Sequence, residues 1–147
     1  CLSRPGEGAF LAGLISFAIG HLVWIVVFFQ LDGFDLSLLS QGLRSLALLA
    51  MAGLALFMLR MLLPRAGALR VPVAIYICII IGMGVAALAT PLWMVIIGAA
   101  LFMASDTLLG LQTFVLDLDS ALERRANALI WPLYWGAIML LSIGGLG

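Results

Sequence analysis

Two ionisable side chains stand inside long apolar segments of this sequence. His21 lies in LAGLISFAIGHLVWIVVF, and Asp106 lies in GAALFMASDTLLGLQTF. A histidine and a carboxylic acid that reach one site can donate and accept protons in turn, which is what general acid–base catalysis requires. Whether these two can meet depends on the elements that carry the two segments.

The composition predicts that these elements lie in a lipid bilayer. Of the 147 residues, 65% are hydrophobic and 10% are charged, against about 45–50% and about 25% in an average soluble domain. In hydrocarbon the backbone must satisfy its own hydrogen bonds. We therefore expect an all-α, polytopic transmembrane helix bundle.

Charge and cysteine content exclude several classes of function. Seven arginines balance seven acidic residues, so the formal net charge is zero and nothing indicates nucleic acid as a partner. Partners are expected among the membrane lipids. Two cysteines are too few for a disulfide framework or a cysteine-rich zinc site, and Cys78, within an apolar run, is interpreted as a small core residue.

Five segments have the length and composition of membrane spans. A span needs about 20 mainly apolar residues to cross about 30 Å of hydrocarbon, and the segments that meet this condition are 9–29, 43–63, 71–88, 92–114 and 128–146. They form a single membrane domain covering residues 1–147. Pro132 is expected in the first turn of the last span, where a missing N–H costs little.

The distribution of arginine predicts an orientation. If the end that carries SRPGEG faces the cytoplasm, every arginine except Arg44 lies on that side, and Asp32 and Asp35 face outward. Short cytoplasmic loops are enriched in arginine and lysine. With its compact loops, this pattern favours a bacterial cytoplasmic (inner) membrane.

Buried polar residues in such spans indicate a functional site, because an ionisable group at mid-bilayer costs at least a few kcal/mol. At a rise of about 1.5 Å per residue, Asp106 lies about 12 Å inside the cytoplasmic boundary and His21 about 18 Å, with Tyr76 and Tyr134 at about 8 and 9 Å. We expect one polar cavity, open to the cytoplasmic side, to serve all four.

The polar residues differ in how strongly they indicate function. Ser105, Thr107 and Thr113 are more simply explained by hydrogen bonds to the backbone or to neighbouring helices. Asp106 favours a functional role, because asparagine could fill a structural one at far lower cost. His21 is balanced between a core residue and a second titratable group in the same cavity.

Four segments resemble, in order, the YhhN family of lysoplasmalogenase-like integral membrane proteins: LAGLISFAIGHLVWIVVF, VPVAIYICIIIGM, GAALFMASDTLLGLQTF and PLYW. The most specific positions are Phe17, Gly20-His21-Leu22, Val71, Pro72, Tyr76, Met83, Gly98, Phe102, Ser105-Asp106 and Phe114. The resemblance implies an eight-span architecture of which this chain is the last five spans, beginning a few residues after the place of a Gly-Asp pair in the preceding helix. Trp135 and Ile138 depart from the family pattern.

The resemblance further implies hydrolysis of the vinyl-ether bond of a lysophospholipid substrate, a lysoplasmalogen, to an aldehyde and a glycerophospho-alcohol. Asp106 and His21 are then the catalytic residues, in either acid or base role, unless the carboxylate of the preceding helix takes one of them. Tyr76, Tyr134 and Ser105 are expected to bind substrate. Neither metal nor cofactor is called for. A lipid-binding or transport protein without enzymatic activity and a structural subunit remain the alternatives, and no oligomeric state is predicted.

Overall fold

A computed structural model of the chain describes residues 7–115 and 121–146. Within these ranges it contains no strand and five α-helices, α1 (Glu7–Gln30), α2 (Gly42–Leu62), α3 (Arg70–Leu88), α4 (Trp93–Phe114) and α5 (Ala121–Leu146). Two short 3-10 helices, η1 (Leu36–Ser40) and η2 (Gly67–Leu69), lie in the connections. All five α-helices are long and apolar enough to cross a membrane. The predicted all-α transmembrane bundle is confirmed.

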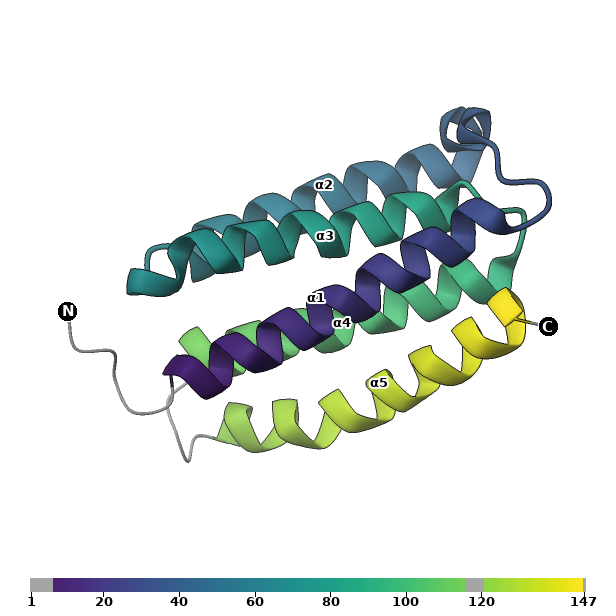
Figure 1. Ribbon diagram of the computed structural model, residues 1–147. Helices are drawn as coiled ribbons and strands as arrows, with labels where there is room; N and C mark the ends of the chain where they lie inside the picture. The colour runs from purple at the N-terminus through teal and green to yellow at the C-terminus, as the bar shows by residue number, and fades with distance from the viewer. Residues whose placement is uncertain (1–6, 116–120, 147) are drawn as a thin grey trace.

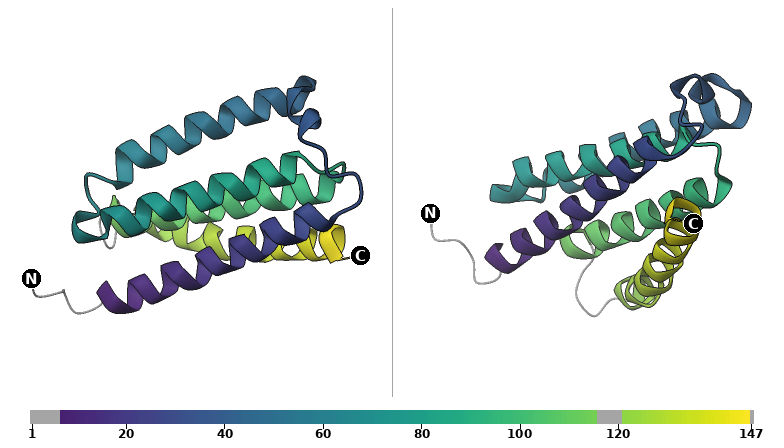
Figure 2. Two further views of the ribbon diagram at one scale, coloured as in Figure 1. Left: turned by 45° about the horizontal axis from the view of Figure 1, so that its top comes forward. Right: turned by 45° about the vertical axis from the view of Figure 1, so that its right-hand side comes forward.

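The helices lie side by side and alternate in direction (Figures 1 and 2). α4 packs along α5, α1 packs along α3, and α3 also contacts α2 and α4. One end of the bundle gathers the beginnings of α1, α3 and α5 with the ends of α2 and α4 (Figure 1). We call this the entry end, and the opposite one, which holds the turn between α3 and α4, the turn end.

The bounds of α2, α3 and α4 agree closely with the spans predicted from hydropathy, whereas the start of α5 does not. α2, α3 and α4 begin and end within one residue of the segments 43–63, 71–88 and 92–114. α5 begins seven residues before position 128, because the alanine, leucine, glutamate and arginine residues there favour a helix while lying outside the apolar run. Pro132 is consequently inside α5, and the expectation that it lies in the first turn is wrong.

The outward faces of the helices are apolar. Leu49 is 70% exposed and Met139 61%, which would be costly over so wide an area in water but suits a surface covered by lipid tails. Cys78 belongs to this outward surface, so its interpretation as a core residue is wrong. A hydropathy signal marks a residue as apolar without showing which face of the helix carries it.

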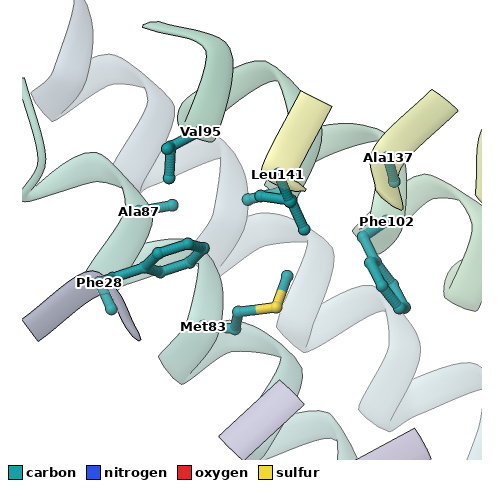
Figure 3. Close-up of a cluster of buried hydrophobic side chains, with 9 residues drawn as sticks. Phe28, Met83, Ala87, Val95, Phe102, Ala137 and Leu141 are labelled. Atoms are coloured by element: carbon teal, nitrogen blue, oxygen red, sulfur yellow. The ribbon is translucent and has the colours of Figure 1, made fainter. Parts of the chain in front are cut away.

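The core of the turn end is close-packed. Phe28, Met83, Val95, Ala137 and Leu141 are fully buried there, from α1, α3, α4 and α5 (Figure 3). Glycines let the helices approach, since a Cβ added at Gly98 would lie 2.9 Å from Cγ of Leu141. Small residues at such contacts are how membrane helices pack without a hydrophobic driving force.

Polar groups close the loops at the turn end. Arg44 donates hydrogen bonds of 2.7 Å to the carbonyl oxygens of both Leu88 and Thr90, at the C-terminus of α3, where the helix dipole favours a cation. In the preceding loop, Asp35 accepts hydrogen bonds from the hydroxyl and the backbone N–H of Ser37, which lower the pKa of Asp35. Arg44 therefore has a structural role at the turn end, which accounts for its location away from the other arginines.

Candidate active site

Three of the predicted site residues meet in the interior of the bundle. His21 comes from α1, Tyr76 from α3 and Asp106 from α4, and they are 0%, 8% and 4% exposed. Tyr134 of α5 stands next to them, with its ring 5.5 Å from that of Phe102. Spacing along separate helices could not establish that His21 faces Asp106; the packing of α1, α3 and α4 brings the two together.

One carboxylate oxygen is the centre of this cluster. Oδ2 of Asp106 accepts a hydrogen bond of 3.0 Å from the hydroxyl of Tyr76 and lies 2.9 Å from Nε2 of His21. The other ring nitrogen of the histidine, Nδ1, lies 2.7 Å from the carbonyl oxygen of Phe17. The acid thus touches both a phenol and an imidazole in a site almost closed to solvent.

The partner of Nδ1 fixes the proton arrangement. A carbonyl oxygen only accepts, so Nδ1 carries a proton and a neutral His21 presents a lone pair at Nε2. An ionised Asp106 would place a second lone pair 2.9 Å away. The contact between Asp106 and His21 is favourable only when a proton lies on one of the two facing atoms. The pair is then either a carboxylic acid with an imidazole or a carboxylate with an imidazolium.

The contact between His21 and Asp106 is close but poorly aligned. Nε2 is buried and forms no hydrogen bond with any described residue, although Oδ2 is within 2.9 Å. The oxygen therefore lies off the direction of the ring N–H bond. The two atoms nevertheless lie close enough for a proton to pass between Nε2 and Asp106.

The local sequence of each helix orients these groups. Phe17 and His21 are four residues apart, so the ring can bond the carbonyl one turn before it. Phe102 and Asp106 share a face of α4 for the same reason, and the ring of Phe102 lies 4.6 Å from that of His21. The ring of Tyr76 lies 5.6 Å from the imidazole as well, so two aromatic rings pack against His21.

The predicted difference in depth between His21 and Asp106 disappears in the structure. The two were expected about 6 Å apart along the membrane normal, from a rise of about 1.5 Å per residue, yet they are in contact. Side chains lean toward the N-terminus of their own helix, and α1 and α4 run in opposite directions. The histidine and the acid therefore lean toward each other.

The hydroxyl groups of α4 bond mainly to backbone. Thr107 donates to the carbonyl of Met103 at 2.7 Å, and Thr113 donates to that of Leu109 at 2.8 Å. Ser105 donates across to the carbonyl of Ile130 in α5, at 3.2 Å, and so ties α5 to the turn that holds Asp106. Binding of substrate by Ser105 stays a prediction.

Two cavities reach Asp106, where one polar cavity was expected. A cavity of about 370 Å³ lies between α1, α4 and α5, and its polar lining comprises Ser105, Asp106, Gln112, Asn127 and Tyr134. A second, of about 200 Å³, lies among α1, α2, α3 and α4 and is lined by apolar side chains apart from Tyr76, Asp106 and Thr113. We call them the polar cavity and the apolar cavity.

The expectation of a single cavity for all four residues is therefore wrong, and His21 lines neither cavity. Asn127 was missed because it precedes the predicted span at 128, whereas α5 begins at Ala121 and carries it as helix. Among the described residues, no three His, Cys, Asp or Glu side chains gather as ligands for a metal ion.

Apolar helices around a buried acid, histidine and phenol define the class of this molecule: a polytopic integral membrane protein with a candidate acid–base site. The particular family follows from a comparison with family models. The model of the YhhN family matches residues 1–145, and the chain belongs to the YhhN family. No curated protein and no solved structure matches it.

Proposed function

We propose that this protein is an intramembrane hydrolase that cleaves the vinyl-ether bond of lysoplasmalogen-type lysophospholipids. The observation that carries the proposal is the position of Oδ2 of Asp106, within 3.0 Å of the Tyr76 hydroxyl and 2.9 Å of His21 Nε2. Membership of the YhhN family is consistent with it. In this proposal, the cluster of Asp106, His21 and Tyr76 supplies one proton for transfer to the substrate.

A vinyl ether requires such a proton. Transfer of a proton from the carboxyl group of Asp106 to the outer alkene carbon forms the new C–H bond and leaves an oxocarbenium ion. The carboxylate left behind faces this cation and stabilises it. The hydrogen bond from Tyr76 holds the carboxylate in position while it is charged.

Water completes the reaction. Its oxygen bonds to the cationic carbon while Nε2 of His21 takes its proton, and the Nδ1–H bond to Phe17 steadies the imidazolium. The resulting hemiacetal collapses to the aldehyde when its glycerol oxygen takes the proton of the His21 imidazolium and leaves as the alcohol, while the hemiacetal hydroxyl gives its proton to the Asp106 carboxylate. One water is consumed and the cluster returns to its starting charge. Acid and base roles can be exchanged between Asp106 and His21 within the same sequence of bonds.

The test is the release of aldehyde by the purified protein from a 1-alkenyl lysophospholipid. A 1-alkyl lysophospholipid with the same chain is the matched control, because its saturated ether cannot be protonated at carbon. In D₂O the aldehyde should carry one deuterium on the carbon beside the carbonyl. Absence of aldehyde, or aldehyde without that deuterium, would overturn the proposal.

The alternative is a lipid-binding or transport protein in which the same cluster serves as a proton-coupled or headgroup site. It predicts tight binding of both lysolipids, no aldehyde, and movement of lysolipid across reconstituted vesicles.

We further propose that the entry end of the bundle faces the cytoplasm in a bacterial inner membrane. Arg60, Arg65, Arg70 and Arg124 lie near the helix termini gathered at that end, as expected from the enrichment of arginine in cytoplasmic loops. A phosphatase fused after the last residue should then be active only outside the cytoplasm; activity confined to the cytoplasm would reverse the assignment.

A further inference from the structure

A groove of about 590 Å³ lies among α2, α3 and α4. It is separate from the two cavities at Asp106 and shares no lining residue with them. The lining is apolar apart from Thr107, whose hydroxyl donates to the carbonyl of Met103. In a bilayer such a space is filled, because lining atoms without a neighbour lose their van der Waals contacts.

The groove is closed toward the entry end, where α2 reaches α4. The hydroxyl of Thr107 lies 3.6 Å from the sulfur of Met58, and a Cβ added at Gly110 would lie 2.9 Å from Cδ1 of Leu62. Toward the turn end, the groove extends to Ile96 in the first turn of α4. It therefore occupies the half of the bundle on the side of the turn end.

The length of the groove fits one leaflet of a membrane. From Ile96 to Leu108 it follows α4 for about 18 Å, at a rise of about 1.5 Å per residue. The hydrocarbon core of a bilayer is about 30 Å thick, so one leaflet contributes about 15 Å. A partner helix in the groove would continue through the other leaflet, where Leu62 and Gly110 close the space. The hydrocarbon chain of a lipid ends within its own leaflet and fits.

A positive charge stands at the turn end of the groove. Arg44 lies one turn before Ala47, a lining residue, on the same face of α2. Its Nη1 donates hydrogen bonds of 2.7 Å to the carbonyls of Leu88, which also lines the groove, and Thr90. Among the described residues, no carboxylate forms an ion pair with Arg44. The guanidinium is therefore available to pair with an anion.

Trp93 indicates that this charge lies at the membrane surface. Its ring is 55% exposed, and tryptophan is enriched where hydrocarbon meets the lipid headgroups. Cζ of Arg44 lies 5.5 Å from the centre of the ring, a cation–π contact that holds the guanidinium at the same level. Ile96, one turn further along α4, already lines the groove. The phosphate of a lipid whose chain enters the groove would lie at this level.

We infer that the groove binds one two-chain phospholipid from the leaflet at the turn end, with an acyl chain between α2 and α4 and its phosphate against Arg44. The guanidinium has donors beyond the Nη1 group that bonds Leu88 and Thr90, and it pairs well with phosphate. This lipid is a structural partner of the bundle and not a substrate. The inference uses neither the Asp106 cluster nor the proposed function.

The experiment measures binding of lipids to the purified protein in an uncharged detergent by native mass spectrometry. The probes are palmitoyl-oleoyl-phosphatidylglycerol and palmitoyl-oleoyl-glycerol, which has the same two chains but no phosphate group. The affinity for the first bound lipid reports on the groove. The ratio of the two affinities reports on the charge, and effects of a substitution on folding cancel in it.

Ala100→Leu should lower the affinity for both lipids at least about fivefold, because a side chain and an acyl chain then compete for one space. Ala100 lines the groove and is exposed, so a leucine can be placed there without displacing a helix. Ala50→Leu, on the α2 side of the groove, is the second variant if the first fails to fold. Ala52→Leu is the matched control, because Ala52 is exposed on α2 and lines neither the groove nor the two cavities. It should bind both lipids as the wild type does.

Arg44→Gln should lower the affinity ratio of phosphatidylglycerol to palmitoyl-oleoyl-glycerol about fivefold, as expected for one arginine beside a phosphate. Arg60→Gln is the matched control, since it removes an exposed arginine near the opposite end of α2. It should leave the ratio unchanged.

Wild-type affinity in folded Ala100→Leu or Ala50→Leu, or an equal fall of the ratio in Arg44→Gln and Arg60→Gln, would overturn the inference. A dimer that Ala100→Leu converts to a monomer would assign the groove to a second copy of the chain and would overturn it as well. None of these results bears on the release of aldehyde from a lysoplasmalogen, so the inference and the proposed function fail separately.

Discussion

At the turn end of the bundle, a Cβ added at Gly98 would lie 2.9 Å from Leu141, and one added at Gly144 would lie 3.0 Å from Cβ of Met94. Toward the entry end, a Cβ at Gly13 would meet nothing within 4 Å, although one at Gly110 would lie 2.9 Å from Cδ1 of Leu62. Gly98 and Gly144 bring α4 and α5 together, whereas Gly13 borders the apolar cavity. The same residue type therefore marks a helix contact at some positions and the edge of a cavity at another.

The two halves also bury different groups. The turn end buries Phe28, Val95 and Leu141 completely, which stabilises the contacts of α1, α4 and α5. The site that opens to the cavities buries an acid, a histidine and a phenol, which is costly in hydrocarbon. The entry end therefore combines the polar site with a second buried apolar cluster, which includes Met58, Val73 and Ile77, and variants of the polar groups should affect turnover more than stability.

Apart from substitution of Asp106 itself, the largest effect is expected from His21→Ala. Loss of the group that exchanges a proton with Asp106 should lower turnover of a lysoplasmalogen about 100-fold. Thr90→Val is the control from the turn end, because Thr90 is also fully buried and its hydroxyl donates to the carbonyl of Ala87. Its turnover should equal that of the wild type. Wild-type turnover in His21→Ala would show that the histidine takes no part in the reaction.

A pair of alanine substitutions compares the two halves directly. Gly98→Ala should lower the free energy of unfolding by about 1–3 kcal/mol, because the new methyl group meets the side chain and backbone of Leu141. Gly13→Ala should raise it by about 0.5–1 kcal/mol through helix propensity. Unfolding titrations in mixed micelles measure both. Equal effects would mean that the two halves do not differ in packing.

Tyr76→Phe should lower turnover about tenfold, since it removes one hydrogen bond to the charged form of Asp106. Tyr134→Phe is the matched substitution in the polar cavity. There we expect a higher KM for the lysolipid with little change in kcat, because Tyr134 lines the polar cavity and would contact a bound headgroup rather than transfer a proton. If Tyr76→Phe instead raised KM and Tyr134→Phe instead lowered turnover, the roles assigned to the two tyrosines would have to be reversed.

The smallest effect is expected from Ser105→Ala. Loss of the hydrogen bond to Ile130 should cost about 0.6 kcal/mol of stability, typical of polar links between membrane helices. Thr107→Val, which loses a bond within its own helix and a weak one of 3.6 Å to the sulfur of Met58 in α2, should cost no more than this. A raised KM in Ser105→Ala alone would assign Ser105 to substrate binding.

The spans were predictable from sequence because each must supply about 20 apolar residues to cross the bilayer. His21 and Asp106 could also be identified from the sequence, because each is an ionisable residue within an otherwise apolar span. Their contact was not predictable, since it depends on the packing of α1 and α4 against α3 and on side chains that lean in opposite directions. Asn127 was missed because hydropathy marks where a helix enters lipid rather than where it begins.

The family could be recognised from short motifs such as Gly20-His21-Leu22 and Ser105-Asp106, and the family match confirms it. The division into two cavities could not be predicted in this way. It arises because Phe17 and Leu109 stand between α3 on one side and α5 on the other, which is a property of packing among four helices rather than of any one segment.

The central claim, that Asp106 supplies the proton, is tested most directly by turnover of Asp106→Asn. Asparagine is nearly the same size and can still accept the hydrogen bond from Tyr76, but it cannot donate a proton as an acid. We predict a fold unchanged in melting temperature or stabilised, with aldehyde release reduced about 100-fold or more. Wild-type aldehyde release by the folded Asp106→Asn protein would contradict the claim.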